Sequence, residues 1–422
     1  MTLTASEQYL LELMNRARLD PAAEAARMGI DLNQGLAAGT LAVTARQVLA
    51  PNAMLEAAAT GHSLWELSAD LVSQTGAGGS QPRGRLVAEG YTPINYAENL
   101  ALIGLGTGQT LQSALEDMNR TLFLSAANRS VLFNGALREI GIGAEAGIYT
   151  QGGQNYNAEA LTMDFATAGP AHFLTGVAYS DTDRNAFYSI GEGTANVSFK
   201  AEGLTTATAA AGGYALSLGN SANTAVTGRV GALSFSLAVD MSANVKLDVV
   251  NGTSFATSGN VVLGTGINNV VLLGVGNLNA TGNVSGNILT GNEGINTLAG
   301  LQGQDKLFGF GGNDKLDGGF GNDQLIGGKA ADLLTGGAGA DMFIFGPKDG
   351  SDKITDFTIA DGDRLQLDDA LWGGAHLKMA EIITQYTTRG VGEVLLDFGL
   401  NGQIHLLGLT TTGGLAAALD IF

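Results

Sequence analysis

The chain has 422 residues, a formal net charge of −19 and no cysteine. The lack of cysteine excludes a disulfide framework and thiol chemistry, and the acidic balance disfavours nucleic acid and anionic membranes as partners but suits a chain that captures cations. Glycine supplies 63 residues, yet the apolar fraction of 45% is ample for folded cores. No apolar run approaches the ~18 residues of a membrane span, and the N-terminus shows no Sec-type signal.

Residues 1–168 are expected to form a first domain that contains both helices and strands. Thr4 and Glu7 have the spacing of a capping box, and the helix that they begin should stop before Pro21. Further elements are expected as a helix after Pro51, a helix over 111–123 and strands over 139–143 and 160–165. The helix after Pro51 should bury a face made of Met54, Ala58, Trp65, Ala69 and Val72.

Six blocks of this segment resemble, in order, those of a bacterial CAP domain, the SCP/PR1-like family of α-β-α sandwiches. They are LMNRARLDP, APNAMLEAAATGHSLW, QTGAGGSQPRGRLVAEGY, YAENL, LSAANRSVL and REIGIG. The resemblance implies a cleft with two histidines and two acidic residues, sometimes holding zinc. The family's histidines fall here on Gln74 and Asn128, its glutamate is Glu98, and Glu116 is the expected second acid. Amides are neither general bases near neutral pH nor good zinc ligands, so any zinc site is expected to be lost.

Two residues of the expected cleft, His62 and Glu98, have alternative roles that the sequence leaves open. His62 is either a core histidine hydrogen-bonded at the cleft wall, which is favoured, or a cleft ligand. Glu98 either holds a turn by accepting backbone N–H groups or contacts a ligand. The resemblance implies that the cleft takes a lipid, peptide or glycan, or only presents a surface.

Residues 170–257 are expected to form a small Ig-like β-sandwich, because short alternating strands are separated there by Gly, Asn and Thr turns. Near its start, Asp181, Asp183, Asn185 and Glu192 fall at positions 1, 3, 5 and 12 of an EF-hand-type loop. The loop has Ala186 where such loops have glycine. It resembles the calcium loop of the B-type repeats of bacterial surface proteins, and the alternative is an acidic hairpin without metal.

Seven consecutive nonapeptides begin at Gly282, each with glycine at position 1 and leucine or phenylalanine at position 8. They match the G-G-x-G-x-D-x-U-x motif, which predicts a calcium-binding parallel β-roll. Glycines at positions 1, 2 and 4 are expected to make the turns, because they tolerate positive φ and close stacking of backbones. The glycines expected at the calcium sites are Gly300, Gly303, Gly309, Gly312, Gly318, Gly321, Gly327, Gly336 and Gly339.

Two nonapeptides should complete one coil, so that residues eighteen apart stack on the same edge. The stacked carboxylates would repel one another unless a cation lies between them, and carboxylate and carbonyl oxygens are the ligands that calcium prefers. Residues 258–281 are expected to form degenerate leading coils, which gives a roll over 258–346. The first two copies carry Asn287 and Asn296, where weak metal binding or simple capping is expected. The expected ligands lie on one edge at Asp305, Asp323 and Asp341 and on the other at Asp314 and Asp332.

Residues 347–422 resemble the C-terminal region of serralysin-type and other RTX proteins exported by type I secretion. The resemblance implies a cap that includes an uncleaved export signal, the type I export machinery as a partner, and a secreted, extracellular or cell-surface protein. The roll would then fold outside the cell, where calcium is abundant and its binding adds to stability.

Motifs of the enzymes that often precede such repeats do not occur. There is no H-E-x-x-H, no G-x-S-x-G and no P-loop. Two hypotheses remain for this multidomain chain of α+β and all-β parts. It is a secreted calcium-dependent binding or structural protein, or it is a secreted hydrolase or peptidase that uses Glu98 with His62. The loss of both cleft histidines favours the first hypothesis.

Overall fold

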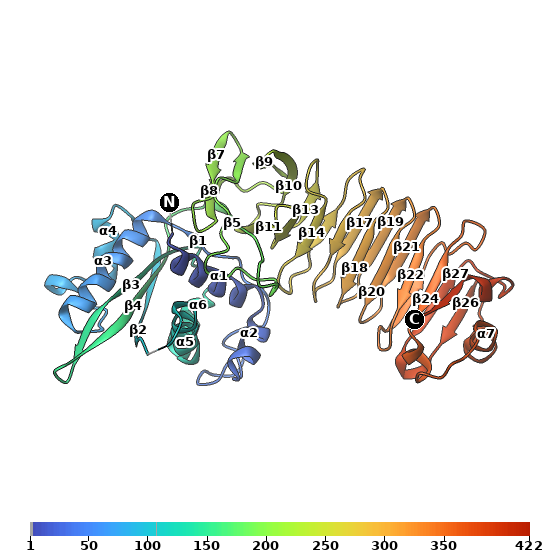
Figure 1. The fold of residues 1–422 in the computed structure, drawn as a ribbon, viewed down its shortest axis with the longest axis horizontal. Helices are drawn as coiled ribbons and strands as arrows, with labels where there is room; N and C mark the ends of the chain where they lie inside the picture. Colours follow the sequence, from blue (N-terminus) through green and yellow to red (C-terminus); the bar gives the residue numbers. More distant parts are fainter. Residues whose placement is uncertain (1–2, 107) are drawn as a thin grey trace. The chain divides into compact units, whose positions relative to one another are not determined.

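The computed structural model describes residues 3–106 and 108–422, which divide into two compact units (Figure 1). The first unit extends to Ala232 and includes Asp240–Gly252, and the second comprises Leu233–Val239 and Thr253–Phe422. None of the described helices is both long and apolar enough to cross a bilayer.

The first unit contains a four-stranded sheet with helices against both faces (Figure 1). The strands lie in the order β1 (Ala50–Pro51), β3 (Glu139–Gln151), β4 (Gln154–Thr167) and β2 (Asn95–Gly104). One face carries α3 (Ala53–Ala69) and α4 (Pro82–Ala88), whose Leu55 and Leu86 join one apolar cluster. On the other face, the main core of the unit gathers side chains from α1 (Ala5–Leu19), α2 (Pro21–Met28), α5 (Leu111–Leu124) and α6 (Ala126–Leu132).

Local sequence signals account for most of the helix boundaries. The capping box of Thr4 and Glu7 is present at the start of α1, and Asp20 caps its end just before Pro21. Of the predicted buried face of α3, only Ala58 is fully buried. Trp65 is half-buried, Ala69 is exposed and Met54 is 41% exposed. The helix instead buries Leu55, Ala58, Ala59, His62, Ser63, Glu66 and Leu67.

Two glycines let α3 lie directly on β3. A Cβ atom at Gly141 would be 2.0 Å from the Leu55 carbonyl carbon, and one at Gly143 would be 2.4 Å from the Thr60 nitrogen. No side chain fits at either position, so the backbones of helix and strand are in contact. The alternate residues Ile140 and Ile142 point to the opposite face and enter the main core.

Two groups of three hydrogen-bonded strands complete the first unit. One contains β11 (Val245–Val250), β5 (His172–Tyr179) and β8 (Gly213–Leu218), and the other contains β9 (Thr224–Val230), β6 (Ser198–Ala201) and β7 (Leu204–Ala207). Phe199 and Tyr214 stack between them with ring centroids 3.9 Å apart. Buried Lys246 of β11 contacts Glu12 of α1 at 2.7 Å. This buried ion pair joins β11 to the N-terminal segment within the first unit.

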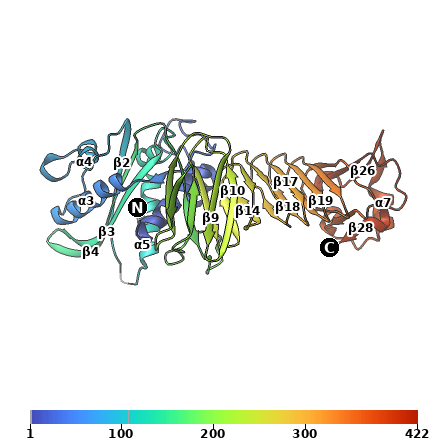
Figure 2. The same ribbon diagram turned by 90° about the horizontal axis from the view of Figure 1, so that it is seen from above.

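The second unit is a parallel β-roll made of two sheets (Figure 2). Strands pair with the strand two places later, and the pairing places Leu298 opposite Leu316 and Leu316 opposite Leu334. This confirms the predicted eighteen-residue coil, and all three leucines are fully buried. One sheet contains β13 (Val261–Leu263), β15 (Asn279–Thr281), β17 (Thr297–Gln302), β19 (Lys315–Phe320), β21 (Leu333–Ala338) and β23 (Ser351–Ile354). The other contains β12 (Ser254–Thr257), β14 (Asn269–Leu272), β16 (Ile288–Thr290), β18 (Lys306–Phe310), β20 (Gln324–Gly328), β22 (Met342–Phe345) and β24 (Arg364–Leu367).

The roll is longer than the seven repeats. At its start, β10 (Leu233–Val239) pairs antiparallel with β13. At its end, β28 (Leu419–Ile421) pairs with β24, and β27 (Gln403–Leu407) pairs with β23. A small antiparallel extension follows from β27 to β26 (Glu393–Asp397) and β25 (Thr387–Arg389), beside α7 (Met379–Tyr386) (Figure 1).

Candidate metal centre

The aspartates at position 6 of the repeats form two ladders along the roll. In one ladder the backbone N–H of Asp305 donates to Asp323 Oδ1 at 2.8 Å, and that of Asp323 donates to Asp341 Oδ1 at 2.9 Å. In the other, the N–H of Asp314 donates to Asp332 Oδ1 at 2.8 Å. The predicted division of these residues between two edges is therefore confirmed.

The second oxygen of each of these five carboxylates is buried and has no hydrogen-bond partner among the described residues. The residues themselves are at most 2% exposed. A buried acceptor without a partner costs roughly 1–3 kcal/mol, and more if it is charged. Five such oxygens in one roll therefore indicate sites that need a bound cation or protons.

The glycine at position 1 leaves room beside each free oxygen. A Cβ atom at Gly300 would lie 2.3 Å from Asp305 Oδ2 and 2.6 Å from the Gly318 carbonyl oxygen. The same pair of oxygens recurs at Gly309 and Gly318. A carboxylate oxygen and a carbonyl oxygen facing one space are hard ligands of the kind that calcium takes, so the residues present fit this ion.

The turn glycines have two different roles. From the third repeat on, positions 2 and 4 have positive φ, as predicted, whereas position 1, for which it was also predicted, does not. Three of the positive-φ positions are occupied by residues other than glycine: Leu301 at 77°, Phe310 at 76° and Ala330 at 88°. The glycine at position 1 is required for a different reason, because a side chain there would displace the carboxylate.

The first two repeats do not offer a free oxygen. Asn287 Oδ1 accepts from the Asn283 N–H at 2.8 Å, and its Nδ2 donates to the Asn268 carbonyl at 2.9 Å. Asn296 makes equivalent bonds with Asn292 and Leu278. Of the two alternatives that the sequence left open, these contacts favour capping of the ladders over metal binding.

Burial perturbs the ladder electrostatics. Desolvation raises the pKa of Asp314 to about 7 and those of Asp305, Asp332 and Asp341 to about 6. The pKa of Asp323 is also raised, mainly by burial. Near neutral pH the ladders therefore carry negative charge in a site that disfavours it, and a cation relieves that cost.

Two aspartates outside the nonapeptides, Asp352 and Asp363, end the ladders. The N–H of Asp332 donates to Asp352 Oδ1 at 2.9 Å, and that of Asp341 donates to Asp363 Oδ1 at 3.0 Å. Their separations of twenty and twenty-two residues depart from the repeat of eighteen, so the nonapeptide frame could not reveal them.

A second acidic cluster lies in the loop between β5 and β6. Carboxylate oxygens of Asp181, Asp183 and Glu192 lie within 4.8 Å of one another. The Asn185 N–H donates to both aspartates, at 3.0 and 3.1 Å. Ala186, which replaces the usual glycine, has φ +58°. The structure thus brings together the four residues predicted from the EF-hand spacing.

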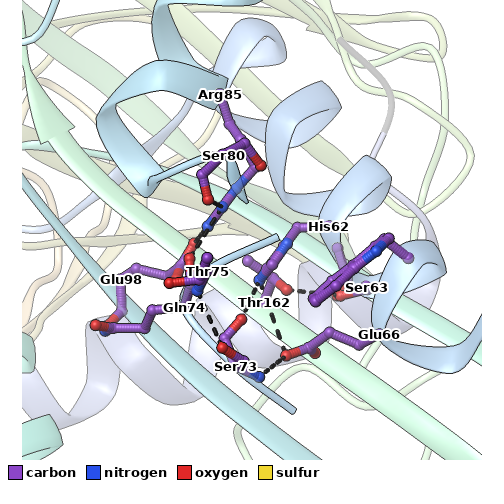
Figure 3. Close-up of polar contacts among 12 residues, drawn as sticks. His62, Ser63, Glu66, Ser73, Gln74, Thr75, Ser80, Arg85, Glu98 and Thr162 are labelled. Atoms are coloured by element: carbon purple, nitrogen blue, oxygen red, sulfur yellow. Dashed lines mark hydrogen bonds and ion pairs between the residues drawn. The ribbon is translucent and has the colours of Figure 1, made fainter. Parts of the chain in front are cut away.

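The predicted cleft residue His62 lies on the buried face of α3 (Figure 3). Its Nε2 atom is 2.9 Å from the Ser73 carbonyl oxygen, and its ring stacks on Trp65. Glu66, one helical turn later, accepts from the Ser73 N–H at 3.1 Å. Burial lowers the pKa of His62 to about 4 and raises that of Glu66 to about 7. These contacts agree with the favoured role of His62, a histidine hydrogen-bonded within the core.

Glu98 forms a buried ion pair with Arg85 of α4 (Figure 3). Its partner in the register of β2 and β4 is Asp164, both of whose carboxylate oxygens are buried without a hydrogen-bond partner among the described residues. Burial, and then the nearby Glu98, raise the pKa of Asp164. Glu116 of α5, the expected second acid, accepts a hydrogen bond from the Tyr9 hydroxyl of α1.

The two residues at the expected histidine positions contact consecutive residues of β2, Gln74 through its side-chain amide and Asn128 through its backbone carbonyl. Gln74 Nε2 donates to the Glu98 carbonyl at 3.2 Å, and Asn99 Nδ2 donates to the Asn128 carbonyl at 3.2 Å. Segments far apart in the sequence thus meet at this point of the strand. Among the described residues, only Asp181, Asp183 and Glu192 form a group of three acidic or histidine side chains whose ligand atoms lie within 4.8 Å of one another.

Comparison with known proteins identifies the repeats. The RTX calcium-binding nonapeptide repeat family matches residues 290–325 and 318–347. The ladders are accordingly RTX-type repeats, and these repeats bind calcium. No curated protein matches the chain.

Two solved structures are similar to part of the chain. The extracellular lipase LipA from Serratia marcescens has 14% identity and a TM-score of 0.22, over 38% of this chain and 41% of the lipase. The AlgE6R3 subunit of the Azotobacter vinelandii mannuronan C5-epimerase has 24% identity and a TM-score of 0.18, over 35% of this chain and 78% of that subunit. The chain thus spans less than half of the lipase.

Proposed function

We propose that the chain is a secreted calcium-dependent binding or structural protein. The observation that supports this most directly is that the two ladders contain five buried aspartate oxygens without a hydrogen-bond partner among the described residues. In low calcium these carboxylates oppose folding of the roll, and calcium at extracellular concentration reverses that balance by binding the folded form. Export by a type I system would deliver the chain to the place where the roll can fold.

The N-terminal segment serves, in this proposal, as a CAP-like extracellular module with a degenerate cleft. The helices on both faces of its sheet and the meeting of Gln74 and Asn128 at β2 are consistent with that resemblance. Amides in place of histidines leave no zinc ligands there. The module would bind a lipid, peptide or glycan, or present a surface.

The loop of Asp181, Asp183, Asn185 and Glu192 is proposed as a separate calcium site. Its three clustered carboxylates and the positive φ of Ala186 support this assignment. Calorimetric titration of the full chain should lose one binding event in the double variant Asp181→Asn/Asp183→Asn. An unchanged number of events would show that the loop is an acidic hairpin without metal.

The alternative function, a hydrolase or peptidase using His62 and Glu98, has less support. The His62 Nε2 atom is occupied by the Ser73 carbonyl, and Glu98 is held by Arg85. Each of the two side chains is thus already engaged by a residue other than its supposed catalytic partner.

Native mass spectrometry of the calcium-folded protein tests both functions. The wild type should carry calcium and no zinc, whereas the variant Gln74→His/Asn128→His should gain one zinc ion. Zinc on the wild type would favour the hydrolase. A wild type without calcium would overturn the main proposal.

A further inference from the structure

Three polar side chains meet on the outer face of the sheet at the C-terminal end of the roll. Ser351 Oγ lies 3.3 Å from His405 Nε2, and His405 Nδ1 lies 3.0 Å from Glu393 Oε2. They come from β23, β27 and β26, which are neighbours in the sheet. Ser351 and His405 are 54 residues apart in the sequence, so a local sequence motif could not predict the cluster.

The order of the contacts is that of a nucleophile, a base and a residue that orients the base. With Nδ1–H donating to Glu393, the free lone pair of His405 is at Nε2 and faces the serine hydroxyl. The side-chain exposures are 18% for His405 and 28% for Glu393. Ser351 is also only half-buried, and the histidine is held between two partners.

The same outer face supplies a group that can stabilise negative charge. Gln403 is the register partner of Ser351, and its Oε1 atom, 3.2 Å from Ser351 Oγ, is a second acceptor that competes with His405 Nε2 for the hydroxyl proton. Lys353 is the register partner of His405 and is exposed. Lys353 thus brings a positive charge to this outer face, where it can stabilise an oxyanion formed at Ser351.

We propose that Ser351, His405 and Glu393 form an esterolytic triad that is separate from the calcium ladders. Its substrates would be carboxylic esters with a small acyl group and a good leaving group. Ser351 Oγ bonds to the carbonyl carbon as its proton moves to His405 Nε2. The ester C–O bond then breaks, the leaving alkoxide or phenolate takes that proton, and water hydrolyses the acyl-serine to a carboxylic acid. Ser351 and His405 are the catalytic residues, and Glu393 is a positioning residue.

The test uses the full chain with saturating calcium and p-nitrophenyl acetate. The expected result is a burst of p-nitrophenol with one acetyl group per chain, mapped by peptide mass spectrometry to Ser351. Ser351→Ala and His405→Asn should lower the rate at least about tenfold, since positioned general bases contribute about 10²–10⁴-fold. Glu393→Gln should lower it as well, and Glu393→Asp should restore part of the loss.

Ser236→Ala is the matched control, because Ser236 also lies on a strand of the second unit and its hydroxyl accepts from the Thr265 N–H at 2.9 Å. It should keep the wild-type rate. Circular dichroism with calcium confirms that each variant folds. Acetyl groups found only on lysines, or equal labelling of Ser351 in wild type and His405→Asn, would show a structural sheet contact and overturn the proposal.

Discussion

Each ladder aspartate uses its two carboxylate oxygens differently. One accepts the N–H of the residue eighteen positions earlier, and the other is left without a partner beside the position-1 glycine. An asparagine can replace the first oxygen but brings no charge to the second site. The substitution of aspartate by asparagine therefore separates the ladder bond from cation binding.

Asp323→Asn is expected to raise the calcium concentration needed to fold the roll by at least about tenfold, because removing one charged ligand at a shared site costs on the order of 1.4 kcal/mol or more. Circular dichroism during a calcium titration measures the midpoint.

Asp317→Asn is the matched control, since it removes the same charge from the same roll outside position 6. Asn287→Ala should also have a smaller effect than Asp323→Asn, because the Asn287 oxygen is already hydrogen-bonded. Equal shifts for Asp323→Asn and Asp317→Asn would contradict the ladder as the calcium site.

Ala330 is a residue under strain at a turn position. It has φ +88° where five other repeats have glycine, and such conformations cost about 1–3 kcal/mol for a residue with a Cβ atom. Ala330→Gly is expected to stabilise the calcium-bound roll by about 1 kcal/mol, measured by urea unfolding. Ala338→Gly, at position 3 of the next repeat, is the comparison and should not stabilise. A destabilised Ala330→Gly variant would show that the turn is not strained.

Much of the ladder could be predicted at the residue scale, because a repeat of fixed period also fixes which side chains stack. The cleft could not be predicted in the same way. Asp164 faces Glu98 through a strand register that the sequence does not display. Glu66, by contrast, lies four residues after His62, and helical spacing could have revealed it.

At the scale of elements, the contact between α3 and β3 depends on backbone proximity. Gly141→Ala is expected to destabilise the first unit by at least about 3 kcal/mol, since the added carbon would overlap the helix backbone. Thermal unfolding in calcium measures the loss.

Gly104→Ala on β2 is the control, because nothing lies within 4 Å of a Cβ atom there. A similar loss of stability in both variants would argue that strand propensity, and not the helix contact, explains the effect.

The buried face of α3 was mispredicted for a related reason. The helix is rich in alanine and glycine, so apolar residues occur around much of its circumference and periodicity does not select one face. Polar His62, Ser63 and Glu66 are buried because they find partners in the sheet and the following loop. Ser63, for example, donates to the Gly143 carbonyl at 2.8 Å.

At the scale of the whole molecule, the ladders link folding to both calcium and pH. The raised pKa values mean that the folded, calcium-free roll binds more protons than the unfolded chain. Stability therefore falls as pH rises from about 4, the unfolded value, through the folded values of about 6 to 7.

Without calcium, the roll is expected to be more stable at pH 5 than at pH 8 by at least about 2 kcal/mol, since each pKa unit corresponds to about 1.4 kcal/mol. Calcium should remove or reverse this trend, because it binds the ionised carboxylates. Urea unfolding with a chelator and with excess calcium, at both pH values, measures the difference. Greater calcium-free stability at pH 8 would contradict the effect of burial on the ladders.

The ends of the roll were the part of the molecule that repeat analysis could not delimit. Strands β12 and β28 lie outside the seven nonapeptides, yet they continue the same pairing with different spacings. Pairing of parallel strands needs only backbone groups and a buried apolar row, so sequences without the motif can extend the roll at either end.

The ladders also have a direction. Every acceptor belongs to a later coil than its donor, and the last acceptors are Asp352 and Asp363. If coils are removed from the N-terminal side, only carboxylate acceptors lose their donors. If coils are removed from the C-terminal side, buried N–H groups lose their acceptors. The ladders therefore end on acceptors at the C-terminal side of the roll. Coils can become ordered one by one from that end toward the N-terminus.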